Sequence, residues 1–287
     1  MCGFVGIISP EPVASALTLG LQAIQHRGQD AAGVGTLNDD GRFHIVKACG
    51  LVTTAIRTED LSRLPGRAGI SHVRYPTAGS TATAEEAQPF VTRTPGILLA
   101  HNGNLTNLAE LVNSLRDEGI HVLSHCDAEP LLLAFAAELN RTRSKDHTAA
   151  DVGRAVKALY GRARGGFTVA AVMMVDGRET LVAFRDPHGI RPGVYAQRED
   201  GTWIVASESV TLDVLDARPL TQLPAGEVML FRAGEAPVTV PVLDAEPRPC
   251  VFERIYFARP DSVMEDGRVN RARWRMGRLL AEEWEQR

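Results

Sequence analysis

Hydrophobic periodicity at the start of the chain predicts a strand followed by a helix. Residues 2–8 form a short apolar run of β-prone residues, and apolar side chains then recur at helical spacing over 13–24 until Gly28 ends the pattern. Alternation over 32–46 predicts a hairpin, and 69–73 predicts a further short strand. The first quarter of the chain is therefore expected to contain mostly strands.

A second buried strand is predicted at 96–100, where five apolar or small residues lead into the polar sequence His101-Asn-Gly-Asn104. The Asn-Gly pair is typical of a turn, which would place it just beyond the end of the strand. Further on, Ser124 with Asp127 three residues later resembles a capping box. It predicts the start of an apolar helix over 128–139.

The remaining elements alternate between helix and strand. Helices are predicted over 108–115, closed by Gly119, and over 149–160. Further strands are predicted over 167–175, 180–184, 193–195, 203–206 and 227–231. A proline-rich stretch at 235–249 is typical of a linker or a loosely paired edge, and 269–284 predicts an amphipathic helix. This order favours an α+β domain that ends near residue 240.

Composition excludes several classes of protein. The 287 residues carry 31 Lys+Arg against 35 Asp+Glu, which gives no electrostatic reason to expect a nucleic-acid or membrane-surface partner. The longest apolar run, 169–175, is too short to span a membrane, and no signal peptide is visible, so a cytoplasmic location is expected. The four cysteines form no CxxC pair, so we expect free thiols and no metal site.

Cys2 is the candidate nucleophile. Removal of Met1, which is usual before a small residue, would leave a thiol with a pKa of about 8.5 and an α-amine with a pKa of about 7.7 to 8.0 on one residue. Such a pair forms a self-contained nucleophile and base, directly or through one water. Taken alone, however, a cysteine at this position is better interpreted as a small core residue, so the surrounding motifs decide.

Those motifs follow one another in a fixed order. They are Met1-Cys-Gly-Phe-Val-Gly-Ile7, His26-Arg-Gly-Gln-Asp30, His72-Val-Arg-Tyr-Pro-Thr-Ala-Gly79, His101-Asn-Gly-Asn104 and Asp127 before a helix. The set resembles the class II, or N-terminal nucleophile, glutamine amidotransferases. Four later motifs resemble the amidophosphoribosyltransferase family of purine biosynthesis: Arg185-Asp-Pro-His-Gly-Ile-Arg-Pro192, Ala206-Ser-Glu-Ser209, Pro224-Ala-Gly-Glu227 and Cys250-Val-Phe-Glu-Arg-Ile-Tyr-Phe-Ala-Arg-Pro-Asp-Ser262.

The resemblance implies a four-layer αββα sandwich and a glutaminase that needs neither metal nor organic cofactor. Cys2 would attack the side-chain amide of L-glutamine, while the Asn102 amide and the Gly103 N–H would stabilise the oxyanion. Arg74 would bind the substrate carboxylate and Asp127 its α-ammonium group. Each has a plainer alternative: an ordinary Asn-Gly turn, a surface ion pair, and a residue that complements the helix dipole.

Other positions have supporting or open roles. Arg27 and Gly28 would shape the pocket around Cys2, although Gly28 is also a plausible helix terminator. Thr77-Ala-Gly-Ser80 resembles the loop that closes over glutamine in this family, with a passive turn as the alternative. Cys250 matches an iron–sulfur ligand of one family branch, but one thiolate cannot hold a cluster. His72 and His101 are assigned no role.

Residues 2–240 are expected to form the glutaminase domain, and 241–287 the connector and first helix of a phosphoribosyltransferase domain whose remainder lies outside this sequence. Ammonia would pass to phosphoribosyl pyrophosphate in a complete amidophosphoribosyltransferase. The alternatives are a standalone subunit that supplies a separate synthase, an amidase for another substrate, and a catalytically silent binding module. An exposed apolar stripe on the last helix would predict a homo-oligomer or a heteromer: Val269, Met276, Leu279, Leu280 and Trp284.

Overall fold

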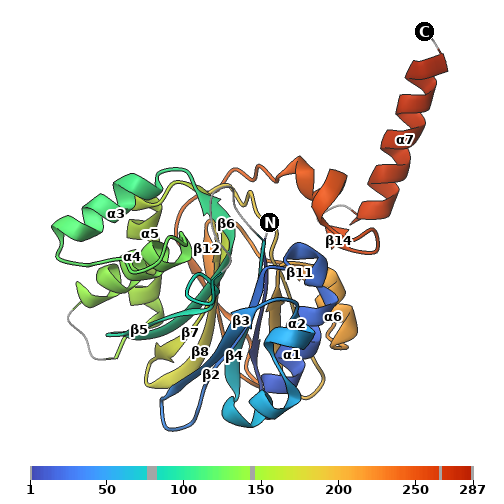
Figure 1. Cartoon of the computed structure of the whole chain (residues 1–287). Coiled ribbons are helices and arrows are strands. Elements are labelled where there is room, and N and C mark those ends of the chain that lie inside the picture. The colour runs from blue at the N-terminus through green and yellow to red at the C-terminus, as the bar shows by residue number, and fades with distance from the viewer. Residues whose placement is uncertain (1, 76–82, 143–145, 265–266, 286–287) are drawn as a thin grey trace.

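Two stacked antiparallel sheets lie between two layers of helices in the computed structural model, which describes residues 2–75, 83–142, 146–264 and 267–285 (Figure 1). The seven-stranded sheet has the order β11 (Thr221–Gln222), β9 (Val194–Gln197), β10 (Trp203–Ala206), β1 (Gly3–Ile8), β4 (Ala68–Arg74), β2 (Ala31–Leu37) and β3 (Phe43–Cys49). The six-stranded sheet has the order β13 (Val238–Pro241), β12 (Glu227–Phe231), β8 (Arg178–Arg185), β7 (Gly165–Val175), β6 (Gly96–Leu105) and β5 (Phe90–Arg93).

Each sheet is covered on its outer face by its own helices. The seven-stranded sheet packs against α1 (Ala14–Ala23), α2 (Val52–Ala55) and α6 (Ser209–Val214). The six-stranded sheet packs against α4 (Ala128–Asn140) and α5 (Ala149–Arg162), with α3 (Leu108–Asp117) beside α4. Short 3₁₀ turns occupy Gln25–Arg27 and Thr58–Arg63, and a π-helical turn occupies Glu253–Phe257. The predicted α+β, four-layer αββα architecture is confirmed.

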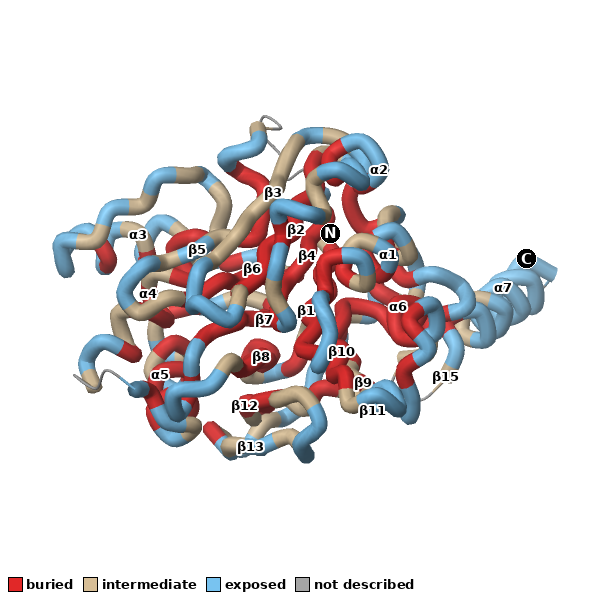
Figure 2. The backbone as a smooth tube through the Cα atoms, turned by 90° about the horizontal axis from the view of Figure 1, so that it is seen from below, coloured by how far each residue is buried: buried red, intermediate tan, exposed pale blue. Residues whose placement is uncertain are grey.

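Strand alternation divides the core into three apolar layers. In β1, Val5 packs toward the helices, whereas Phe4 packs into the layer between the sheets. In β6, Leu99 packs toward the helices and Ala100 packs between the sheets. Figure 2 shows the buried strands at the centre and the exposed segments around them. Because successive side chains alternate, even-numbered residues at the ends of β1 and β6 belong to the same inner layer.

The predicted turn at 101–104 is wrong. Strand β6 continues to its end at Leu105, with Asn102 opposite Thr168 of β7. The polar residues stay in the strand because β7 runs alongside them and pairs with each one. At Gly103 this pairing is so close that a Cβ would come within 2.4 Å of the Gly166 carbonyl oxygen, so only glycine fits.

The predicted capping box before α4 is also wrong. Asp127 is the N-cap residue of α4, but its side chain makes no capping hydrogen bond. The Ser124 hydroxyl instead accepts a hydrogen bond from the Cys126 N–H. The carboxylate of Asp127 is directed toward β6, as described below. In the proline-rich stretch, β13 pairs with β12 at the edge of the six-stranded sheet, so the edge interpretation is correct there.

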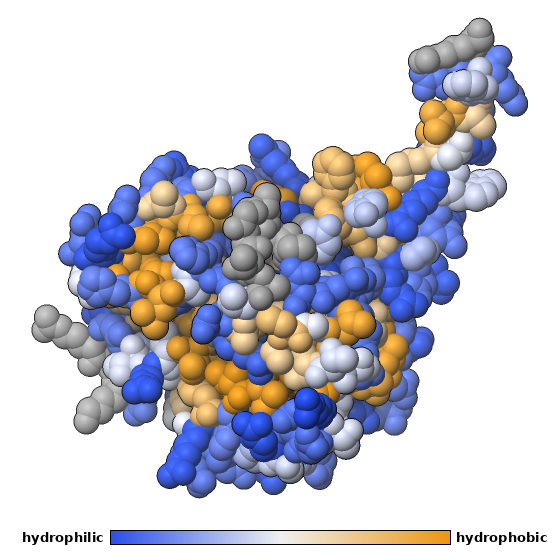
Figure 3. Space-filling model, in the orientation of Figure 1, coloured by the Kyte–Doolittle hydropathy of each residue, from blue (hydrophilic) through white to orange (hydrophobic). Residues whose placement is uncertain are grey.

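The last described residues leave the body of the molecule. A two-residue hairpin of β14 (Val263–Met264) and β15 (Gly267–Arg268) leads into α7 (Val269–Glu285), which projects away from the sandwich (Figure 1). Val269 is buried, so its place in the predicted exposed stripe is wrong; Met276, Leu279, Leu280 and Trp284 are exposed as predicted. Figure 3 shows hydrophobic side chains gathering at the base of this helix and along it. Among the described residues, no helix is long and apolar enough to cross a membrane.

Candidate active site

Cys2 directly precedes β1, next to Arg74, the last residue of β4. The register places Gly3 opposite Val73, so the next residue along each strand also comes close to the other. Burial raises the pKa of the Cys2 thiol, and the charge of Asp127 adds to the rise while Arg74 opposes it. The thiol is therefore protonated at neutral pH, and its attack on a substrate requires a base.

Arg74 is buried and shares the inner layer with Cys2 by the alternation of β4. Its Nη2 lies 4.0 Å from Oε2 of Glu86. The backbone of Arg74 is packed against the loop after the first helix: the Asp30 N–H donates to its carbonyl oxygen over 3.2 Å, and a Cβ on Gly28 would lie 2.5 Å from its carbonyl carbon. Gly28 therefore allows a close approach of two backbone segments at this site.

Asn102 brings an unusual polar group into the inner layer. Its side chain is fully buried, and neither its amide nitrogen nor its amide oxygen has a hydrogen-bond partner within the described ranges. Leaving a buried amide without a partner costs about 1–3 kcal/mol per group. Groups of this kind in a native fold mark strain, function or an unseen bound molecule. The Asn102 amide is available to a ligand that enters this layer.

Gly103 directs its backbone N–H away from β7. In β7, Phe167 uses both of its backbone groups on the other side: its N–H donates to the Asp186 carboxylate over 3.1 Å, and its carbonyl accepts from the Asp186 N–H over 2.6 Å. Gly103 and Phe167 therefore form a non-hydrogen-bonded pair. On the opposite side of β6, the pairing with β5 stops at Leu99. The Gly103 N–H thus points to an edge that none of the described strands covers.

The two neighbouring backbone N–H groups on this edge of β6 both donate to side-chain oxygen atoms. The His101 N–H donates to the side-chain oxygen of Gln88 over 2.7 Å, and the Leu105 N–H donates to Oδ2 of Asp127 over 2.9 Å. Gly103 lies between them with the same backbone orientation. Oxygen atoms occupy both flanking donors, so the geometry at Gly103 suits a third oxygen.

Asp127 lies beside this edge with its carboxylate already oriented. Oδ1 lies 3.1 Å from Nε2 of His101. Burial alone would raise the pKa of Asp127, but His101 and the Leu105 N–H outweigh it and hold that pKa below its usual range. Asp127 is therefore an anion at neutral pH.

Two histidines that the sequence left without a role lie at the site. The ring nitrogens of His72 have no hydrogen-bond partner among the described residues, and His72 is buried. Burial is the main cause that lowers the pKa of His72 to about 3, so the ring is neutral at physiological pH. His101 orients Asp127. The sequence offered only the proximity of both histidines to the predicted site residues, which did not separate these roles.

Arg27 makes contacts that the sequence did not reveal. Its fully buried guanidinium forms ion pairs with Glu253 over 2.7 Å and with Glu208 over 3.4 Å. Burial alone would lower the pKa of Arg27, but these carboxylates hold it above its usual range. Its aliphatic stem packs near Gly3. The only sequence signal for the two glutamates was their place in the motifs 206–209 and 250–262.

A cavity of about 410 Å³ opens next to Arg27. Its lining residues come from the loop after α1, from Tyr75 and from the π-helical turn: His26, Arg27, Gln29, Asp30, Tyr75, Tyr256 and Phe257. The predicted closing loop at Thr77–Ser80 lies outside the described residues. The four cysteines are free thiols, and the described part of the chain contains no group of three or more side chains placed to hold a metal ion.

Comparison with known proteins gives a consistent assignment. Residues 74–214 match a family model described as a glutamine amidotransferase domain. The chain is 43% identical to amidophosphoribosyltransferase from Pseudomonas aeruginosa over 98% of its own length, and 43% identical to that from Escherichia coli over 99%. It covers 56% and 58% of these relatives, so the chain spans a little over half of their length.

A solved structure gives the same result. Glutamine phosphoribosylpyrophosphate amidotransferase from Bacillus subtilis, in complex with ADP and GMP, superimposes with a TM-score of 0.83 at 29% identity and covers 98% of this chain and 58% of its own. Its fold agrees with the architecture described above. The chain belongs to the class II glutamine amidotransferases and is similar over nearly its whole length to amidophosphoribosyltransferases.

Proposed function

We propose that this chain hydrolyses L-glutamine to glutamate and ammonia through a thioester on Cys2. The observation that carries the proposal is the pairing of a buried, unpartnered Asn102 amide with the outward Gly103 N–H, on the inner layer that Cys2 shares. A side-chain amide and a backbone N–H on adjacent residues can both donate to a carbonyl oxygen as it becomes an anion. The family assignment supports glutamine as the amide.

The chemistry proceeds in two stages. The Cys2 sulfur adds to the amide carbon of glutamine, and the resulting oxyanion accepts hydrogen bonds from Asn102 and Gly103. The C–N bond then breaks, the leaving nitrogen takes up the proton that the thiol gave to the base, and ammonia leaves, which produces a γ-glutamyl thioester. Water hydrolyses the thioester to glutamate and regenerates the thiol. Because burial raises the pKa of the Cys2 thiol, the α-amine exposed by removal of Met1 acts as the base.

Arg74 and Asp127 account for recognition of an amino acid. The guanidinium of Arg74 would bind the substrate α-carboxylate and exchange its distant contact with Glu86 for a two-point hydrogen bond. Asp127 would accept hydrogen bonds from the α-ammonium group. Each of its carboxylate oxygens has one hydrogen-bond partner in the structure and can accept a second hydrogen bond. Arg27 and Gly28 would support the pocket from behind through Gly3 and the Arg74 backbone.

For the fate of the ammonia, we propose transfer to phosphoribosyl pyrophosphate, bound by a part of the protein that is not in this sequence. Support comes from relatives whose names state this activity and of which the chain spans a little over half. In this proposal residues 2–240 are the glutaminase domain and 241–287 lead to the acceptor domain. A standalone subunit that supplies a separate synthase is the alternative. A cytoplasmic location fits either arrangement.

The exposed face of α7 fits a partner surface. Trp274, Leu280 and Trp284 are all more than 60% exposed, which is unusual for large apolar side chains gathered on one helix. We propose that an acceptor domain or a second copy of the chain covers this face.

Labelling with 6-diazo-5-oxonorleucine, an electrophilic mimic of glutamine, tests the glutaminase proposal. Intact mass and peptide mapping should show a chain without Met1 that carries one adduct on Cys2, and Cys2→Ala should remain unlabelled. A processed chain that neither reacts with the reagent nor releases ammonia from glutamine would refute the proposal. Retention of Met1 in an active chain would refute the role of the α-amine.

A further inference from the structure

A cluster of buried charges lies behind the nucleophile. The side chains of Arg27, Glu208 and Glu253 are each no more than 1% exposed. Glu208 also accepts from Nε2 of His26 at 2.8 Å in the protonated or Nε2–H form, and Arg191 lies 3.8 Å from Glu253. Buried charges are tolerated only when they are paired, so the position of the Arg27 guanidinium is fixed by its two carboxylates.

The position of Arg27 determines where β1 begins. An ideal Cβ on Gly3 would lie 3.0 Å from Cδ of Arg27, which places the arginine stem directly against the residue after Cys2. The next residue is held by a second contact, because the Phe4 N–H donates to the Ser207 hydroxyl over 3.0 Å. Glu208 follows that serine. The start of β1 therefore contacts both Arg27 and the segment that carries Glu208.

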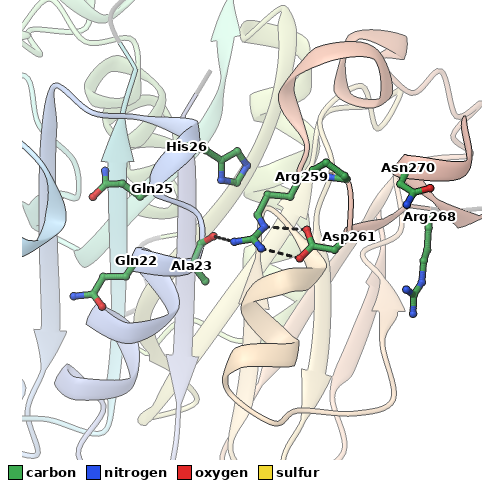
Figure 4. A pocket seen from close by; sticks show the side chains of 9 residues that line it. Gln22, Ala23, Gln25, His26, Arg259, Asp261, Arg268 and Asn270 are labelled. Atoms are coloured by element: carbon green, nitrogen blue, oxygen red, sulfur yellow. Dashed lines mark hydrogen bonds and ion pairs between the residues drawn. The ribbon is translucent and has the colours of Figure 1, made fainter. Parts of the chain in front are cut away.

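Glu253 belongs to a different part of the chain, the segment 250–262 after the last sheet strand. This segment is attached near its start by the Cys250 N–H, which donates to the Ile190 carbonyl over 3.0 Å. Near its end, Arg259 donates from its N–H to Glu208, pairs with Asp261 and reaches the Ala23 carbonyl at the end of α1 (Figure 4). Between these points, Glu253 is the side chain that enters the buried cluster.

We propose that Glu253 is a positioning residue for the Cys2 nucleophile: it holds Arg27 against Gly3 and so couples the placement of segment 250–262 to the geometry of the glutaminase site. The inference rests on the proposed function of Cys2. It follows that the glutamine-binding groups should be unaffected by loss of Glu253, whereas the alignment of the sulfur should suffer. The expected signature is a change in kcat with little change in KM.

The test compares Glu253→Gln with the parent chain by kinetics and by amide hydrogen exchange of the peptide that spans residues 2–8. We expect kcat for glutamine hydrolysis to fall about 10-fold with KM within about twofold, as for a misplaced reacting group. Exchange in residues 2–8 should become at least threefold faster. The matched control is Glu246→Gln, since Glu246 is an exposed residue of the same region that pairs only with Arg248 among the described residues; it should change neither readout.

Unchanged exchange in residues 2–8, or an unchanged kcat, would overturn the proposal and leave Glu253 a merely structural partner of Arg27. If Glu253→Gln does not fold, Glu253→Asp replaces it, because aspartate keeps the buried negative charge but places the carboxylate one methylene further from Arg27. In that variant the fall in kcat and the faster exchange in residues 2–8 should both be smaller. If the parent chain has no glutaminase activity, the proposed function fails, and the exchange experiment alone still decides whether Glu253 orders the start of β1.

Discussion

Replacing Asn102 with alanine should separate activity from stability. The change removes one of two proposed oxyanion donors, an effect of about 2.7–4 kcal/mol on the transition state, or about 100- to 1,000-fold in kcat. Most buried side chains that are truncated also destabilise the fold. Asn102 differs because its amide has no partner among the described residues, so the native state already bears a desolvation cost.

The stability change is the sum of two opposing effects. Removing the unpartnered amide relieves about 1–3 kcal/mol, while the small cavity left by the lost atoms costs about 1–2 kcal/mol. The free energy of unfolding should therefore change by no more than about 1 kcal/mol, which corresponds to a shift in Tm of about 2–4 °C for a chain of this size. Asn102→Ala should be nearly inactive and nearly as stable as the parent.

Initial rates of glutamate release at saturating glutamine measure the first effect, and thermal unfolding followed by circular dichroism measures the second. Asn113→Ala, on the exposed surface of α3, controls for loss of an asparagine side chain and should leave both quantities unchanged. A variant that keeps kcat within about threefold of the parent would refute the oxyanion role. A loss of activity that follows a large loss of stability would refute the argument from the unpartnered amide.

Three further predictions follow from burial and packing. His72 has a folded pKa of about 3 and an unfolded pKa of about 6.5, so between pH 6.5 and 4.5 the unfolded chain binds a proton that the folded chain does not, and the free energy of unfolding should fall by about 2–3 kcal/mol. In urea unfolding measured across this pH range, His72→Gln should lack this part of the fall; an equal dependence on pH in both chains would contradict the prediction. Gly103→Ala should lower stability by about 2–4 kcal/mol and abolish glutaminase activity because a backbone oxygen blocks the new Cβ, whereas Gly161→Ala, with open space around it in α5, should raise stability by about 0.5–1 kcal/mol in the same unfolding assay. Leu280→Glu combined with Trp284→Glu should reduce any concentration-dependent association seen by sedimentation velocity, and an unchanged association constant would show that α7 is not the contact surface.

Most of the elements follow from local pattern. The strands β1, β7 and β8 and the helices α4 and α5 lie close to their predicted ranges, because their apolar spacing and flanking turn residues are strong signals over short distances. The exceptions are places where a distant segment overrides the local signal. Asn102-Gly103 has the composition of a turn, but pairing with β7 keeps it extended. Short strands such as β5 carry too few residues to show a period.

The sequence by itself determined the family, the α+β layering and the identity of the residues proposed to bind and attack glutamine, since these depend on residue types in a fixed order. Only the tertiary structure decided how their polar groups are oriented. The open edge at Gly103 and the unpartnered amide of Asn102 depend on the register of β6 with β7, and the carboxylates around Arg27 come from segments up to 226 residues away. Register of that kind fixes which side chains face each other, and no local pattern encodes it.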